Sequence, residues 1–134
     1  MNPLNVLIVG KARSIVNWYE YTASAFEESG HTVYQFATNG LGPIDRIRYR
    51  QQAHAADYEK NLIQRIQRLL AGKSVDLCLS VSTYWMPQSL LRWVKDSFPR
   101  CMNIGWVGDK FTASFKDHAA ILDKIYYTDS SFVT

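Results

Sequence analysis

The chain has 134 residues, of which 47% are hydrophobic and 20% are charged, a balance that suits one folded domain rather than a disordered segment. Its net charge of +3 is too small to indicate a nucleic-acid partner. No apolar run is long enough to form a transmembrane segment, and the N-terminus lacks the pattern of a secretory signal. We therefore expect a globular protein of the cytoplasm.

The first predicted element is a strand at residues 6–9, which are apolar without interruption and include three β-branched side chains. Such a run is typical of a strand that is covered on both faces in the centre of a parallel sheet. Gly10 follows, and glycine permits a sharp turn and the close approach of a ligand to the backbone. A helical pattern begins soon afterwards, which is typical of the start of a doubly wound α/β domain.

Helices and strands then alternate along the chain. Apolar residues recur at spacings of three and four in three segments, and these spacings predict helices at residues 14–29, 55–71 and 87–98. A fourth, brief helix is expected at residues 117–121. Apolar runs bounded by turn residues predict further core strands at residues 31–37, 75–81, 101–107 and 123–128.

Residues 44–50 differ from the core strands because apolar and charged side chains alternate there. This period of two predicts a short extra strand at the edge of the sheet, with Arg46, Arg48 and Arg50 on one face. A charged edge discourages association between sheets. Phosphate binding by the three arginines is the alternative interpretation.

The order of elements predicts an α/β fold, a doubly wound three-layer sandwich with a mostly parallel sheet of about five core strands and Rossmann-like topology. The expected strand order is edge-2-1-3-4-5. Ligands of such sheets bind outside the carboxyl ends of the strands, at the switch point, which here falls between the first and third strands. Residues 1–134 are expected to form one domain.

Three loops should meet at this carboxyl edge, after the first, third and fourth core strands. The first loop contains Gly10 and also Arg13, whose planar guanidinium suits a phosphate or carboxylate. The second loop offers hydroxyl groups and aromatic rings that suit a sugar, although the rings would equally well cap the core. Its residues are Ser82, Thr83, Tyr84 and Trp85.

Asp109, in the third loop, is the only carboxylate of the three loops. A carboxylate at the edge of a crevice can act as a general base, and it can equally cap the segment that follows. The first turn has one glycine where the dinucleotide fingerprint has three, so tightly bound NAD or FAD is not expected. Cys78 and Cys101 lie in apolar strands and are predicted to be free, buried thiols rather than metal ligands or a disulfide.

Two longer stretches suggest a family. "NVLIVG" with a helix that ends in "ESGHTV", and "IGWVGDKF" with "LDKIYYTDSSFV", resemble CgeB-like (spore-maturation-protein-like) glycosyltransferases of the two-domain GT-B type. The matching acidic and aromatic positions are Trp106, Asp109, Asp123 and Asp129. The resemblance implies a sugar transferase and assigns this chain to its acceptor-side N-terminal domain, the first half of a longer protein.

The same resemblance implies the substrates and partners. The donor is a nucleotide sugar, bound mainly by a C-terminal domain absent from this chain, and the acceptor is a molecule of unknown identity. Asp109 is then the catalytic candidate, and the other loop residues named above bind substrate. No cofactor is implied, no metal is implied because the sequence has no DxD motif, and the fragment alone is expected to be inactive.

Alternatives from other classes remain open. A flavodoxin-like or receiver-like module would bind a small ligand or a protein without catalysis. A receiver needs paired acidic residues directly after the first strand, where this chain has Gly10 and Lys11, and "GKARS" is a poor version of the flavodoxin phosphate loop. A non-catalytic interaction domain is the third possibility, and a large exposed apolar patch would favour it.

Overall fold

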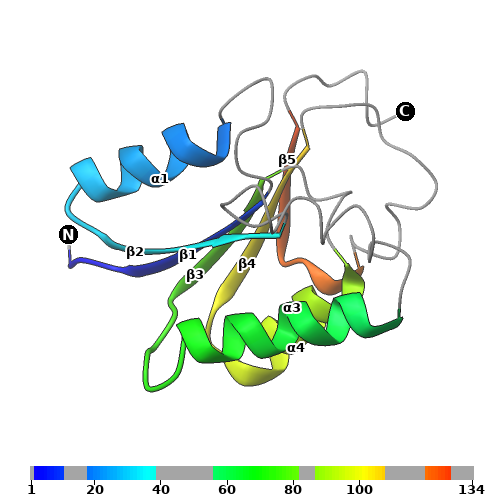
Figure 1. The fold of residues 1–134 in the computed structure, drawn as a ribbon. Coiled ribbons are helices and arrows are strands. Elements are labelled where there is room, and N and C mark those ends of the chain that lie inside the picture. The colour runs from blue at the N-terminus through cyan, green and yellow to red at the C-terminus, as the bar shows by residue number, and fades with distance from the viewer. Residues whose placement is uncertain (1, 11–17, 39–55, 82–86, 108–119, 128–134) are drawn as a thin grey trace.

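The computed structural model describes residues 2–10, 18–38, 56–81, 87–107 and 120–127. Within these ranges a five-stranded parallel sheet lies between helices on its two faces (Figure 1). The strands are β1 (Asn5–Gly10), β2 (Thr32–Ala37), β3 (Leu77–Val81), β4 (Met102–Val107) and β5 (Lys124–Tyr127). The helices are α1 (Trp18–Glu28), α3 (Ala56–Leu69) and α4 (Gln88–Ser97).

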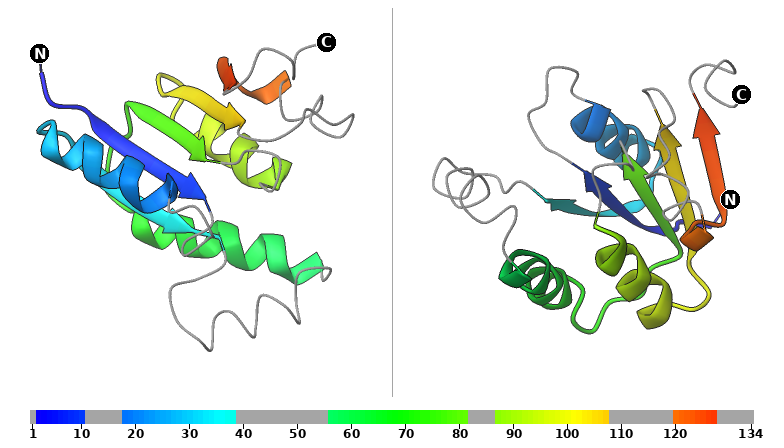
Figure 2. Two further views of the ribbon diagram at one scale, coloured as in Figure 1. Left: turned by 90° about the horizontal axis from the view of Figure 1, so that it is seen from above. Right: turned by 90° about the vertical axis from the view of Figure 1, so that its right-hand side faces the viewer.

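The strand order is β2-β1-β3-β4-β5, which confirms the doubly wound α/β fold and the predicted order of the core strands. The additional edge strand predicted at residues 44–50 lies outside the described residues. Of the brief helix predicted at residues 117–121, Ala120 and Ile121 are described and are helical. α1 covers one face of the sheet, and α3 and α4 cover the other (Figure 2).

β1 is the most buried strand, as its uninterrupted apolar sequence predicts. Val6 and Ile8 belong to the core on the α1 side of the sheet, whereas Leu7 and Val9 belong to the core on the opposite side. All four side chains are at most 1% exposed. Because side chains alternate between the faces of a strand, only a strand with cover on both faces requires every position to be apolar.

The face under α3 and α4 is densely packed, and we call it the closed face. The helices contribute buried side chains at helical spacing to this core; they are Leu62, Ile66, Leu90, Leu91 and Val94. The Ser89 hydroxyl donates a 3.0 Å hydrogen bond to Glu59 and so joins α4 to α3. The guanidinium of Arg65 lies 5.4 Å from the centre of the Phe36 ring, within the range of a cation–π contact.

The helix ends follow the sequence signals with one adjustment. Gly30 and Gly72 have φ of 92° and 70°, the left-handed conformation that terminates a helix and favours glycine. Pro87 was expected within the first turn of its helix, but it is the N-cap, with extended angles of φ −60° and ψ 133°. Extended angles are usual for a cap residue, and the fixed φ of proline is compatible with them.

Polar contacts fix the amino edge of the sheet. The backbone N–H of Asn5 donates to the Asp76 carboxylate at 2.8 Å, and the Asn5 side-chain amide donates to the Ser74 hydroxyl at 2.7 Å. The Nδ1 atom of His31 accepts the backbone N–H of Leu4 at 3.0 Å. His31 therefore acts as a structural residue at the edge opposite the predicted ligand site.

Among the described segments, we find no helix with the length and apolar character needed to cross a membrane.

Candidate functional site

The carboxyl edge of the sheet was the predicted ligand site, and Gly10 is its described member. The Thr38 backbone N–H donates to the Gly10 carbonyl at 2.9 Å, which ties the ends of β1 and β2 together. A side-chain carbon at Gly10 would lie 3.1 Å from Cδ2 of Tyr19 and 3.3 Å from Cβ of Val81. These contacts are tighter than ordinary packing allows, so the absence of a side chain at this position serves the packing of Tyr19.

Tyr19 packs beneath α1 at this edge and is 2% exposed. Its hydroxyl oxygen is buried and has no hydrogen-bond partner among the described residues. Burial raises the pKa of the phenol above its ordinary value, and the neighbouring charge of Glu20 adds to the effect. Tyr19 is therefore a neutral, structural side chain at physiological pH.

The other predicted site residues lie outside the described residues. They are Arg13, Ser82, Thr83, Tyr84, Trp85 and Asp109. Their strands end side by side at the carboxyl edge, because β1 pairs with β3 and β3 with β4 in parallel register. The convergence of the loops on one ligand, with Asp109 as a base, stays a prediction.

The two thiols are free and buried, as predicted. Cys78 lies on the closed face of β3 and is 1% exposed, and Cys101 directly precedes β4. Burial raises the pKa of Cys101 to about 11, with the charge of Asp123 adding to the shift. Burial raises the pKa of Cys78 further above its ordinary value than it raises that of Cys101. Neither thiol is a nucleophile near neutral pH.

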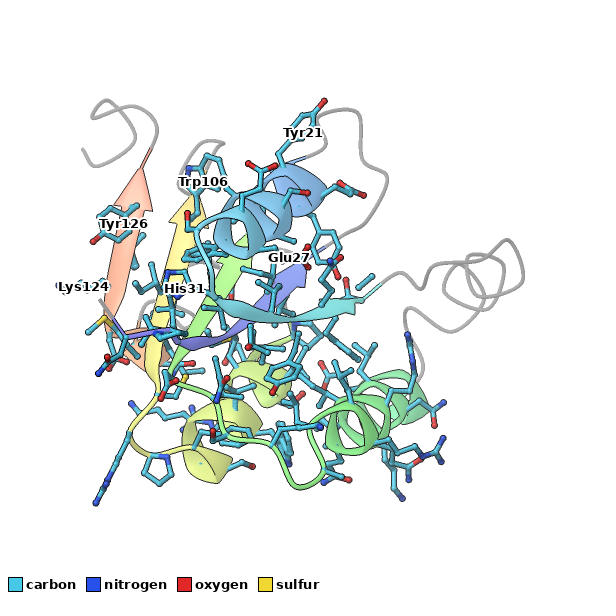
Figure 3. The ribbon with its side chains drawn as sticks, turned by 90° about the vertical axis from the view of Figure 1, so that its left-hand side faces the viewer. Tyr21, Glu27, His31, Trp106, Lys124 and Tyr126 are labelled. Atoms are coloured by element: carbon cyan, nitrogen blue, oxygen red, sulfur yellow. The ribbon has the colours of Figure 1, made fainter. Side chains whose placement is uncertain are left out.

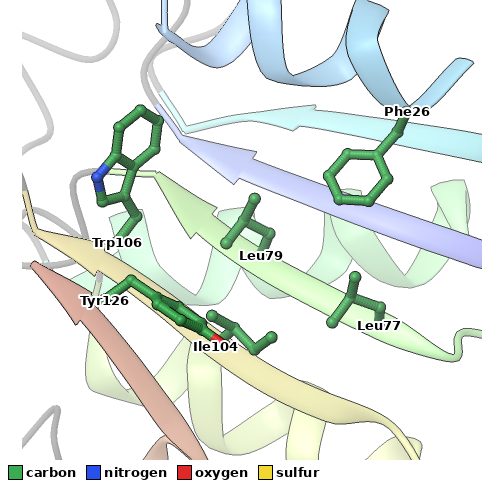
Figure 4. A pocket seen from close by; sticks show the side chains of 6 residues that line it. All are labelled: Phe26, Leu77, Leu79, Ile104, Trp106 and Tyr126. Atoms are coloured by element: carbon green, nitrogen blue, oxygen red, sulfur yellow. The ribbon is translucent and has the colours of Figure 1, made fainter. Parts of the chain in front are cut away.

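An apolar groove lies on the α1 side of the sheet, beside α1 and over β3, β4 and β5 (Figure 4). Its volume is about 280 Å³. Its lining is entirely hydrophobic or aromatic and consists of Phe26, Leu77, Leu79, Ile104, Trp106 and Tyr126. The parallel register places these strand residues in rows, with Leu79 beside Ile104 and Trp106 beside Tyr126. Such a lining suits an apolar partner and offers little to a charged substrate.

The sequence analysis did not identify this groove, although one signal was available. β3, β4 and β5 all place apolar residues on the α1 side of the sheet. The helices predicted after β2 all belong on the opposite face. A right-handed connection from β3 to β4 requires its helix on the α3 and α4 side. The described chain therefore supplies α1 alone to cover that face, and α1 packs on β1 and β2.

The described residues contain no cluster of three or more histidine, cysteine, aspartate or glutamate side chains that could hold a metal ion.

Comparison with known proteins identifies the fold. No protein-family model matches the chain, and no curated protein matches its sequence. A Burkholderia pseudomallei response regulator, solved with a phosphorylated aspartic acid, a calcium ion and citrate, matches with a TM-score of 0.58 and 14% identity over 97% of this chain. This chain spans 62% of that protein.

Two further response regulators match at a TM-score of 0.51 and over 95% of this chain. One is from Thermotoga maritima, with 11% identity and 86% of that chain covered. The other is RcsB from Salmonella enterica serovar Typhimurium, solved with promoter rprA in the presence of phosphomimetic BeF3-, with 10% identity and 61% of that chain covered. At such low identity the likeness establishes the fold, which is the receiver-like, flavodoxin-like form of the Rossmann-like α/β class.

These matches correct the prediction of a CgeB-like GT-B domain, which is wrong, together with the acceptor-side transferase function. The physical reason is that the quoted motifs are short strand-end patterns. A buried strand followed by glycine and an acidic residue, as around Trp106, suits the carboxyl edge of any doubly wound sheet. The sugar acceptor and the nucleotide-sugar domain were expected on that resemblance alone. The absence of a cofactor stays a prediction.

Proposed function

We propose that this chain is a receiver-like module that binds a partner through its surface and performs no phosphoryl transfer. Its likeness to three response regulators over 95–97% of its length supports the receiver-like part of the proposal. Protein partners and a cytoplasmic location are part of the same proposal.

One observation carries the non-catalytic part: the two central strands lack a carboxylate at their carboxyl ends. The Burkholderia structure contains a phosphorylated aspartic acid and a calcium ion. Such chemistry needs a carboxylate nucleophile, and a divalent cation needs further oxygen ligands. Here β1 ends at Gly10 and continues in the sequence with lysine, and β3 ends at Val81 and continues with serine.

The next acidic residues along the sequence lie in helices and do not directly follow the two central strands. After β1 the next is Glu20, in α1, and after β3 the next is Asp96, in α4. Asp109 follows β4, which is one strand away from the switch point between β1 and β3. The pair of central strands therefore offers no acceptor for a phosphoryl group.

The test is to incubate the 134-residue chain with acetyl phosphate and Mg²⁺ and to measure its intact mass. We expect no phosphoryl adduct, and we expect BeF3- with Mg²⁺ to leave the amide NMR spectrum unchanged. An adduct that is lost in Asp109→Asn would contradict the proposal. Titration with flavin mononucleotide discriminates the flavodoxin-like alternative, for which amide shifts at Gly10 and Thr38 would be the signature.

A further inference from the structure

The outer side of α3 carries a row of basic and amide side chains, which we call the α3 stripe. Its members are all exposed, and they are Lys60, Asn61, Gln64, Arg65 and Arg68. They recur at spacings of three and four residues, so they share the side of the helix opposite the buried Leu62 and Ile66. From Lys60 to Lys73 the sequence has no acidic residue. The stripe therefore combines cations with neutral hydrogen-bonding groups.

Charge on the α3 stripe is not arranged as on a helix that only meets water, where opposite charges three and four residues apart stabilise the helix. Arg65 and Arg68 are like charges three residues apart, which is a destabilising pair. The helix dipole accounts for Arg68, in the last turn, but not for Arg65 or Lys60. Glu59 accepts a hydrogen bond from Ser89 of α4, so it is directed toward α4 rather than along the stripe. An anionic partner would explain the cations.

Positive charge is concentrated on the α3 side of the sheet. Residues 60–73 include four basic residues, whereas α1, on the opposite face, has three glutamates and no basic residue (Figure 2). The net charge of +3 averages over both faces and so understates the positive charge along α3. A polyanion is therefore attracted to α3 and repelled from α1.

The chemistry of the stripe favours duplex DNA among polyanions. Membrane-surface helices place apolar side chains beside the basic ones. The large hydrophobic side chains that are exposed within the described ranges lie on α1, β4 and β5, and they are Tyr21, Met102 and Tyr126. Single strands are bound by aromatic rings that stack on bases, and the stripe has no ring. Arginine, lysine, asparagine and glutamine are the residues that contact phosphates and base edges in duplex DNA.

The shape of α3 also suits DNA. α3 has 14 residues and is therefore about 21 Å long. It lies beside α4 and below β2, at one end of the strand order (Figure 2). The major groove of B-DNA is about 12 Å wide and admits a helix. The major groove of duplex RNA is deep and narrow and does not.

We propose that the outer side of α3 binds double-stranded DNA, with the helix lying against the major groove. Lys60, Arg65 and Arg68 contact phosphates, and the amides of Asn61 and Gln64 contact phosphate oxygens or base edges. The Arg65 guanidinium lies 5.4 Å from the centre of the Phe36 ring, a contact that uses its flat face and leaves the N–H groups at its rim for a phosphate. This inference goes beyond the proposed function, which concerns the ends of β1 and β3.

The closing experiment measures the fluorescence anisotropy of a labelled DNA duplex titrated with the 134-residue chain over a series of salt concentrations. Arg65→Gln and Arg68→Gln each remove one proposed phosphate contact. Lys124→Gln is the matched control, because it removes the same charge from an exposed position on β5. At about 50 mM salt we expect each arginine variant to bind roughly ten-fold more weakly, with the salt slope reduced by about one. The control should be unchanged.

A neutral substitution separates hydrogen bonding from charge. Gln64→Ala should weaken binding about three-fold or more and leave the salt slope unchanged, because the amide has no charge. Gln35→Ala, at an exposed position on β2, should change neither quantity. Circular dichroism melting shows whether each variant is folded. Arg68→Gln keeps the test valid if Arg65→Gln loses stability with its Phe36 contact.

Other polyanions serve as competing arms of the same titration. They are duplex RNA, single-stranded DNA, poly-glutamate and phosphatidylserine vesicles, and we expect each to bind more weakly than duplex DNA at equal salt. Tighter binding to any of them would overturn the proposal. A folded chain that does not bind duplex DNA at low salt would overturn it as well, as would a loss of affinity in Lys124→Gln equal to that in the arginine variants.

Discussion

Both faces of the sheet carry apolar side chains, but helices cover the two faces unequally. On the closed face, Leu91 and Ile66 belong to the core that also contains Leu7 of β1, and they are at most 1% exposed. On the other face, equally dense packing is found over β1 and β2, under Tyr19 and Ala23 of α1. This dense packing ends at β3. Beyond that line Tyr126, whose ring is largely apolar, is 55% exposed. Apolar side chains alone therefore do not ensure that a face of the sheet is covered, because the chain must also place a helix on that face.

The largest expected difference between the faces is in core truncation. Leu91→Ala on the closed face should lower the free energy of unfolding by about 2–5 kcal/mol, because it leaves a cavity in a packed core. Leu79→Ala in the apolar groove on the α1 side should cost about 1 kcal/mol, because less apolar area returns to water. Urea denaturation of both variants measures the difference. Equal losses would show that the second face is closed.

Gly10→Ala tests the packing between the end of β1 and α1. The new methyl group would lie 3.1 Å from the Tyr19 ring, so the substitution should cost about 1–3 kcal/mol of stability through overpacking. Val81→Ala removes one of the two contacting side chains, and the double variant should lose less stability than the sum of the single losses. Additive losses would place the strain elsewhere, and a neutral Gly10→Ala would remove the packing explanation.

Tyr19→Phe removes a buried hydroxyl that has no partner among the described residues. We expect the variant to gain about 1 kcal/mol of stability, because the folded state no longer excludes an unpaired polar group from water. Tyr21→Phe is the matched control on the same helix and should change stability little, because Tyr21 is 68% exposed. A loss of stability in Tyr19→Phe would mean that the hydroxyl has a partner.

The thiols of the closed face should give the smallest effect near neutral pH and a measurable one in alkali. The pKa of Cys101 rises from 9.0 to about 11 on folding. Above pH 9 the unfolded state therefore binds fewer protons than the folded state, so stability should fall as the pH rises from about 9 to 11 and should not depend on this thiol below pH 9. Cys101→Ala should make this part of the profile less steep in urea denaturation, and the slope that is left includes the contribution of Cys78, whose pKa is also raised by burial.

Thiol labelling gives a second readout of the same burial. Cys78 and Cys101 should react slowly with a thiol reagent at pH 8 in the native protein and quickly in urea. Fast native labelling of Cys78 would show that the closed face opens readily.

The sequence was sufficient for most of the fold because the relevant signals are local. The apolar run at residues 6–9 identified the central strand, and helical spacing identified the helices that carry the buried residues Leu62, Ile66 and Leu91. The apolar groove on the α1 side was missed because Ile104 and Trp106 alternate in sequence just as buried residues do. Period two shows which residues share a face, but it does not show whether a helix covers that face.

The predicted ligand site shows what the sequence could not establish. Gly10 was interpreted as a place for a ligand to approach, whereas the described contacts explain the glycine by the Tyr19 ring. Asp109 and the residues after β3 were grouped by topology, and topology places strand ends together without specifying where their side chains point. Short motifs around Trp106 suggested the wrong family for a related reason, because many doubly wound sheets share that local pattern.

The central claim is that the two faces of the sheet differ in cover. Methyl NMR with a soluble paramagnetic agent tests it most directly. The methyl groups of Leu79 and Ile104 should relax strongly, and those of Leu91 and Ile66 should not. Equal protection of the four residues would contradict the account.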